Sequence, residues 1–267
     1  MSNNSLIIFK GKHIMTHNLT KNYLWIFSII LYCIIQTNSF ADNKSDKREK
    51  LMSLIAGKPS AIPYVLNELD QKDKVKLLTL ITIMNRKFWI NEDISIKVVK
   101  NMPDWHNDFP EVYLAAIKQI SSMIKNKATF KEICLQMDNN EPFCKDVGAE
   151  LMYGEKDQEI KKTLEMFSDQ INPKSQLILK ELSSDSDAIA KKNISTKKIV
   201  KILQNGSLSQ KHFMLLFLQQ EEKYAENIDL IKQLDVLAES NKTQSIKLMT
   251  NRLLKKFKDK NAKKEKQ

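Results

Sequence analysis

Residues 113–124 of the chain read YLAAIKQISSMI, and their apolar side chains recur at the three- and four-residue spacing that lines one face of an α-helix. Polar side chains fill the opposite face, so the pattern predicts an amphipathic helix that begins near Pro110. The same one-faced spacing returns in residues 160–167, 230–238 and 246–257. The chain is therefore expected to build its core from a series of helices.

Two further stretches are apolar on nearly every side, VKLLTLITIM at 75–84 and FMLLFL at 213–218, and both are expected to be central helices. In the first stretch polar residues recur every three or four positions, which favours a helix over a strand. The 267 residues include only 5 glycines, and no glycine-rich phosphate-binding motif is present. Nucleotide-binding α/β folds are thus disfavoured, and the predicted fold class is all-α.

Residues that start helices agree with this fold class. Ser195 and Ser209 are expected N-caps, and Pro173 should lie just inside a helix start. No clear linker divides the chain, although the polar stretch SSDSD at 183–187 is a candidate boundary between two lobes.

Polar breaks recur at intervals of about 32 to 37 residues, long enough for two short helices each. The breaks lie near Gln71, Asp108, Asn140, Asn172, Ser207 and Asn241. This rhythm resembles an α-solenoid of the HEAT or tetratricopeptide kind, with about five to six helical hairpins, but the resemblance lies in length and rhythm alone. No unit carries the tetratricopeptide pattern W-x2-L-G-x2-Y, and no HEAT consensus returns between units. An irregular helical bundle is the alternative.

The N-terminal segment has the order of a bacterial export signal. Lys21 precedes the apolar run YLWIFSIILYCII at 23–35, which is shorter than the roughly 20 residues that a membrane-spanning helix needs. The small residues Ser39 and Ala41 match a signal-peptidase site, which predicts cleavage before Asp42.

The expected organisation is a signal peptide at 1–41, a helical domain at 42–254 and a lysine-rich disordered tail at 255–267. Residues 1–14 become an upstream extension if translation starts at Met15. An uncleaved anchor is the alternative interpretation of the apolar run. Both interpretations export the helical domain, so a periplasmic or secreted location is predicted, without a transmembrane segment in the mature chain.

The composition gives a net charge of +11, from 43 basic and 32 acidic residues. Arginine occurs only at Arg48, Arg86 and Arg252, whereas sequence-specific reading of nucleic acids relies on the planar fork of arginine. Sequence-specific nucleic-acid binding is therefore not expected. A chain rich in lysine, asparagine and isoleucine is also typical of A/T-rich coding sequences, so the basic balance is weak evidence for a polyanionic partner.

Two cysteines follow the apolar N-terminal run, Cys134 and Cys144. An oxidising compartment favours a disulfide between them across the segment LQMDNNEPF. Closing so short a loop contributes roughly 3 kcal/mol of stability. The alternative is a pair of buried free thiols. No metal site is expected here, because neither His106 nor His212 is near the cysteines in sequence.

The chemically richest stretch is NMPDWHNDFPEVY at 101–113, which places aromatic and acidic residues between two prolines. Its carboxylates and single histidine are metal-ligand types, but their spacing fits neither zinc nor an EF-hand. We interpret the stretch as an inter-helix loop with its aromatic residues tucked into the core, and recognition of a peptide or protein as the functional alternative. The candidate binding residues are Asp104, Trp105, His106, Asp108, Phe109 and Glu111.

The sequence contains neither G-x-S-x-G nor H-E-x-x-H, and no pair of carboxylates has surroundings that would separate their pKa values. Neither an enzyme nor a cofactor is expected. The expected function is an exported helical scaffold or adaptor that binds another protein in the bacterial envelope or outside the cell. One alternative is a lysine-mediated binder of polyanions or an anionic membrane surface, with weak association. A cell-wall hydrolase is a further alternative.

Overall fold

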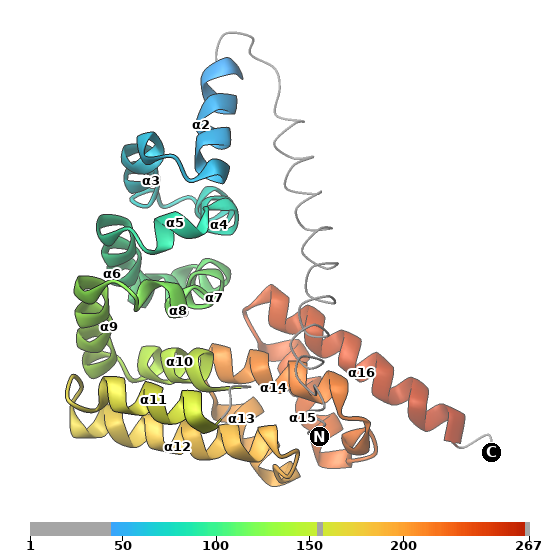
Figure 1. Cartoon of the computed structure of the whole chain (residues 1–267). Coiled ribbons are helices and arrows are strands. Elements are labelled where there is room, and N and C mark those ends of the chain that lie inside the picture. Colours follow the sequence, from blue (N-terminus) through green and yellow to red (C-terminus); the bar gives the residue numbers. More distant parts are fainter. Residues whose placement is uncertain (1–43, 154–156, 265–267) are drawn as a thin grey trace, which may run out of the picture. The chain divides into compact units, whose positions relative to one another are not determined.

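The computed structural model describes residues 44–153 and 157–264, and within these ranges the chain forms α-helices and short 3-10 helices but no strand (Figure 1). The all-α prediction is confirmed. The predicted signal peptide, including Ser39, Ala41 and Asp42, lies outside the described residues. The chain divides into two compact units, residues 1–52 and 53–267, and the packing reported below is that of the second unit.

The helices are short in the first half of the chain and longer in the second. The first half contains α2 (Lys44–Ala56), η2 (Pro59–Ala61), α3 (Ile62–Glu68), α4 (Lys74–Ile83), α5 (Arg86–Trp89), α6 (Glu92–Asp108), α7 (Pro110–Ile117), α8 (Ile120–Met123) and α9 (Lys127–Asn139). The second half contains α10 (Glu141–Met152), α11 (Asp157–Ser168), α12 (Pro173–Ala190), α13 (Thr196–Asn205), α14 (Leu208–Gln220), η3 (Glu222–Tyr224), α15 (Ile228–Ser240) and α16 (Gln244–Lys264).

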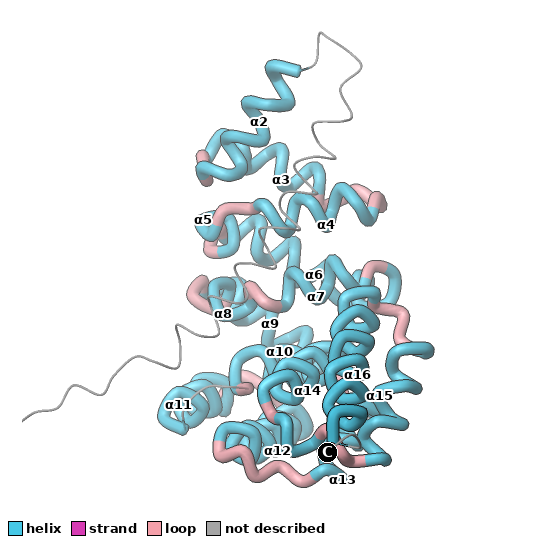
Figure 2. The backbone as a smooth tube through the Cα atoms, turned by 90° about the vertical axis from the view of Figure 1, so that its right-hand side faces the viewer, coloured by secondary structure: helices cyan, strands magenta, loops and turns pink. Residues whose placement is uncertain are grey.

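Two rows of helices run through the second unit. In one row α3 packs on α6, α6 on α9 and α9 on α12, and in the other α4 packs on α7, α7 on α10 and α10 on α14. Figure 2 shows this stacking, with α14 alongside α10. Serial rows are expected of a helical repeat, in which each unit contacts its neighbours. The contact of α14 with α10 instead brings back a helix from much later in the chain, as a bundle does.

Buried polar contacts join neighbouring units at nearly constant sequence separation. The Ser95 and Thr129 hydroxyls lie 2.6 Å apart, and the Ser186 hydroxyl donates to the Met152 carbonyl at 2.6 Å; both pairs are separated by 34 residues. Further links at similar separations, not all of them buried, join Asn101 to Leu69, Asn126 to Glu92, Asn172 to Asp138 and Ser175 to Met137. This separation matches the interval between the predicted polar breaks.

The buried apolar side chains form two clusters, one within residues 54–182 and the other within 194–257. Ile189 and Leu208 pack against both clusters. The candidate boundary at 183–187 is not a linker, because these residues lie inside α12, where Asp185 and Ser186 are buried, but the first cluster does end just before it, at Leu182. The break between clusters therefore falls in the last turns of that helix, where Ala188 already packs against the second cluster.

The amphipathic segment 113–124 forms two helices rather than one. The chain turns at Lys118 and Gln119 between α7 and α8. The apolar spacing does not reveal this turn, because the stripes of the two short helices stay in phase across it. The two segments apolar on nearly every side do form helices, α4 and part of α14, although Val75 is 73% exposed.

The expected helix starts at Ser195 and Pro173 are confirmed. The expected N-cap at Ser209 was wrong, because Ser207 caps α14 and forms a capping box with Gln210. Ser207 and Ser209 are both serines and have the same intrinsic preference for the N-cap position. In the structure the backbone amide of Ser209 instead donates to Asp146. Propensity alone does not separate the two.

The predicted disordered tail at 255–267 differs from the structure, in which α16 continues to Lys264. Phe257 extends the apolar stripe of this helix and is 1% exposed, so core packing holds the lysine-rich segment in helical form. Residues 265–267 lie outside the described ranges. Among the helices that are described, none combines the length and apolar character needed to cross a bilayer.

Candidate functional site

The expected binding loop at 101–113 is mostly helix. Helix α6 continues to Asp108 with Pro103 inside it, so the proline does not mark a loop as the sequence suggested. Trp105 is 4% exposed and belongs to the first apolar cluster, and Phe109 packs against that cluster from the junction of α6 and α7. The prediction that both aromatic residues enter the core is confirmed, whereas the loop itself was wrong.

The remaining candidate residues of that stretch separate. Asp104 and Asp108 are exposed on α6. Glu111, in the first turn of α7, accepts a hydrogen bond from the Gln244 backbone at 2.7 Å and pairs with Lys74 at 2.8 Å. Although burial raises the pKa of Glu111, these partners lower it below its ordinary value. Glu111 therefore ties the start of α16 to α7.

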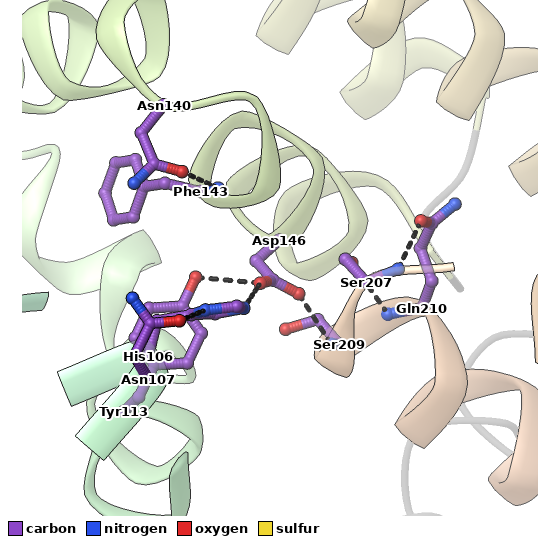
Figure 3. A network of polar contacts seen from close by, with 9 residues as sticks. All are labelled: His106, Asn107, Tyr113, Asn140, Phe143, Asp146, Ser207, Ser209 and Gln210. Carbon is purple, nitrogen blue, oxygen red and sulfur yellow. Dashed lines mark hydrogen bonds and ion pairs between the residues drawn. The ribbon is translucent and has the colours of Figure 1, made fainter. Parts of the chain in front are cut away.

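His106 points toward a buried carboxylate, Asp146 of α10. Its Nε2 atom lies 4.0 Å from Oδ2 of Asp146, and its ring meets the edge of the Tyr113 ring. The Tyr113 hydroxyl donates to the same Oδ2 at 2.8 Å, and the Ser209 backbone amide donates to Oδ1 at 2.6 Å. Figure 3 shows Asp146 between His106 and Tyr113 on one side and Ser207 and Ser209 on the other.

Asp146 is fully buried, and this burial determines its electrostatics. Desolvation raises the pKa of Asp146, while hydrogen bonds from Ser207, Ser209 and Tyr113 and the charge of His106 oppose the increase. Burial and the same carboxyl raise the pKa of Tyr113 well above its ordinary range. Because the carboxyl holds the start of α14 against α10 and α7, we assign it a structural role.

A second polar group lies one helical turn further along α10. Burial raises the pKa of Glu150 to about 7, opposed by Lys118 and assisted by Asp146. Lys118 Nζ lies 3.4 Å from Nε2 of His212, whose pKa burial and this lysine lower to about 3. His212 is buried at the contact of α14 with the first cluster, which fits the structural interpretation of this residue from sequence.

Beside the Asp146 cluster lies an open hollow of about 610 Å³, lined from residues 106–110, 203–211 and 233–243, and here called the groove. It contains the start of α7, the ends of α13 and α15 and the start of α14. Its apolar lining residues are Pro110, Leu203, Leu208, Val236 and Leu237. Its side-chain amides are Asn107, Gln204, Asn205, Gln233 and Asn241.

The groove brings His106 together with residues that sequence reasoning did not select. Lys211 lies one turn into α14, and Lys242 lies between α15 and α16. Asp146, which lies next to His106, gave one signal in the sequence, since it is a carboxylate beside the apolar residues Val147, Gly148 and Ala149. The lysines gave none, because the chain carries lysine throughout.

The predicted disulfide was wrong. Cys134 and Cys144 are both buried and free. Asn140 alone joins α9 to α10, so the intervening residues form helix rather than a loop. The Cys144 sulfur lies 3.9 Å from the Ser175 carbonyl oxygen, toward α12. Burial raises the pKa of the Cys134 and Cys144 thiols, to about 12 and about 11.

The site offers shape and hydrogen-bonding groups. The distance from His106 to Asp146 exceeds a hydrogen bond, and the carboxyl has no exposed surface. Over the described ranges, no group of three or more histidine, cysteine or acidic side chains is placed to hold a metal. Comparisons with protein-family models, curated proteins and solved structures found no match for this chain.

Proposed function

We propose that this chain is an exported, non-enzymatic helical scaffold whose groove binds an extended segment of another protein in the bacterial envelope or outside the cell. The groove is the observation that carries this proposal. It is an open hollow lined by both apolar and polar side chains. Helical arrays present long surfaces of this kind to protein partners.

The amide side chains favour a peptide as the occupant. A peptide backbone offers both donors and acceptors, and each asparagine or glutamine side chain supplies both. Gln204 of α13 donates a hydrogen bond to Gln233 of α15 at 3.0 Å, and both side chains line the groove. Val236, 54% exposed beside them, provides an apolar anchor point whose burial would favour binding.

The lysine-rich end of α16 gives less support to the alternative of a polyanion binder. Lys256 and Lys260 pair with Glu222, and Lys258 pairs with Asp235. These pairs reduce the positive potential that a diffuse electrostatic partner would meet. Export is proposed from the sequence of residues 1–41, and intact-mass analysis of exported protein tests it through an N-terminus at Asp42.

Site-specific photo-crosslinking in the native organism tests the protein-binding proposal. A photoreactive amino acid at position 236 should capture a defined protein, because Val236 lines the groove. The matched control is position 228, since Ile228 lies on the same helix, is 67% exposed and does not line the groove. Equal capture from both positions, or no capture from 236, would refute the groove as the binding site.

A further inference from the structure

We infer that the groove takes an acidic peptide segment, whose carboxylates are bound by Lys211 and Lys242 while its apolar side chains contact the Val236 wall. This inference rests on the proposed function and specifies the chemistry of the partner. It depends on the charges in the groove lining and on how the neighbouring acids are engaged.

The charge of the lining has one sign. Its ionisable side chains are His106, Lys211 and Lys242, and the lining contains neither aspartate nor glutamate. The remaining lining residues are amides, hydroxyl residues and apolar side chains. A peptide carrying acidic groups would therefore meet no like charge in the groove itself.

The two lysines are available for a ligand. Within the described part of the chain, no carboxylate lies within ion-pair distance of Lys211 or Lys242, although many exposed lysines elsewhere are paired. Lys211 is half-buried, and desolvation lowers its pKa, with Asp146 opposing the decrease. A ligand carboxylate would return to this ammonium the stabilisation that burial removes.

Two of the nearby acids, Asp146 and Glu111, are held by other groups. Asp146 is enclosed by the hydrogen bonds from Tyr113 and Ser209 and has no exposed surface. Glu111 is occupied by Lys74 and the Gln244 backbone. The carboxylates of Asp146 and Glu111 are thus held by other residues and do not line the groove, whereas Lys211 and Lys242 do. We expect this arrangement to select an acidic peptide that fits the groove over an arbitrary polyanion.

The test uses the full mature chain and two labelled peptides, one alternating leucine and glutamate and the other alternating leucine and glutamine. Fluorescence anisotropy should show binding of the glutamate peptide, weakened about tenfold by Lys211→Gln or by Lys242→Gln. Lys232→Gln is the matched control, because Lys232 is an exposed lysine of α15 that does not line the groove. Rising ionic strength should weaken binding of the acidic peptide.

Equal binding of the two peptides would overturn the inference, as would a loss from Lys232→Gln as large as the loss from Lys211→Gln. Lys211→Met repeats the Lys211 test with the aliphatic stem retained, and circular dichroism confirms that each variant is folded. Competition by anionic vesicles or duplex DNA that equals the acidic peptide would also overturn it, in favour of diffuse charge. If a protein crosslinked at position 236 is retained by the Lys211→Gln/Lys242→Gln variant, the inference fails while the proposed function stands.

Discussion

The stacked region from α3 to α12 and the returning region from α13 to α16 are held to their neighbours by different kinds of contact. In the stacked region polar links join residues about one unit apart, as Ser95 joins Thr129 across 34 residues. The returning region has such links too, but it also reaches back to the stacked region. Ser209 contacts Asp146 across 63 residues, and Gln244 contacts Glu111 across 133.

This difference also locates the groove that we propose as the binding surface. In the stacked region each helical unit contacts its neighbours in the chain. Such contacts can be predicted from sequence patterns that recur from one unit to the next. The groove exists only because α14 and α16 are brought against α10 and α7 by long-range contacts. Contacts between residues far apart in the chain cost more conformational entropy than contacts between neighbouring units. We therefore expect the groove to depend on fewer and stronger polar contacts than the stacked region does.

The largest effect is expected from Asp146→Ala. The substitution leaves the Ser209 amide and the Tyr113 hydroxyl buried without their acceptor, which should lower the free energy of unfolding by about 3 kcal/mol. Urea denaturation measures the loss. Hydrogen exchange should show increased opening of α14, and uniform opening of the stacked region would contradict the proposed difference between the regions.

A smaller effect is expected from Ser186→Ala, which removes one link of the stacked region. The Ser186 hydroxyl donates to the Met152 carbonyl, and its loss should cost about 1 kcal/mol by the same urea measurement. Ser184→Ala is the control, because Ser184 is exposed on the same helix. If Ser186→Ala lowers the free energy of unfolding as much as Asp146→Ala does, links within the stacked region matter as much as the contacts of Asp146. The proposed difference between the two regions would then be wrong.

The pH dependence of stability tests the second polar group on α10. Burial raises the pKa of Glu150 to about 7 in the folded chain, so between pH 4.5 and about 7 the folded state holds a proton that the unfolded state has released. Glu150 therefore lowers stability as pH rises through that range, by about 1 kcal/mol after allowance for partial solvent screening.

Glu150→Gln should remove this contribution, so the variant should gain stability relative to the wild type as pH rises from 4.5 to 7. His212, whose pKa is lowered to about 3, acts in the opposite direction, and the difference between variant and wild type cancels its contribution. Thermal unfolding across the pH range measures this difference. A flat difference curve would show that Glu150 is not desolvated at the contact between the regions.

The sequence predicted the helix junctions of both regions but not the contacts that bring the two regions together, for a physical reason. The breaks near Asn140 and Asn172 coincide with helix junctions, because a cap and a change of apolar phase are local signals. The contact of α14 with the stacked region includes pairs such as Lys118 with His212, separated by 94 residues, for which one sequence carries no pattern. The continuation of α16 through the lysine-rich segment to Lys264 was likewise not predicted, although the apolar stripe that ends at Phe257 was.

Asparagine illustrates how composition can mislead. Its abundance was attributed to A/T-rich coding, yet asparagine side chains accept hydrogen bonds from the first turns of many helices in the structure. These N-caps are Asn85, Asn91, Asn126, Asn140, Asn172 and Asn227. The two explanations are compatible, because asparagines favoured by A/T-rich coding can still be retained where they cap helices.

The smallest effect is expected at the cysteines, which lie in the stacked region. Cys134 and Cys144 are free, so a reducing agent should leave the thermal midpoint unchanged. Their burial and raised pKa values also predict slow alkylation of the folded chain and rapid labelling of both thiols after unfolding. A disulfide worth a few kcal/mol would instead give a decrease of several degrees on reduction, since about 1 kcal/mol corresponds to roughly 2 to 4 °C in a domain of this size. Such a decrease would mean that a covalent bond reinforces the contact of α9 with α10. The stacked region would then not be held by local hydrogen bonds alone, and its contrast with the long-range contacts of Asp146 would have to be revised.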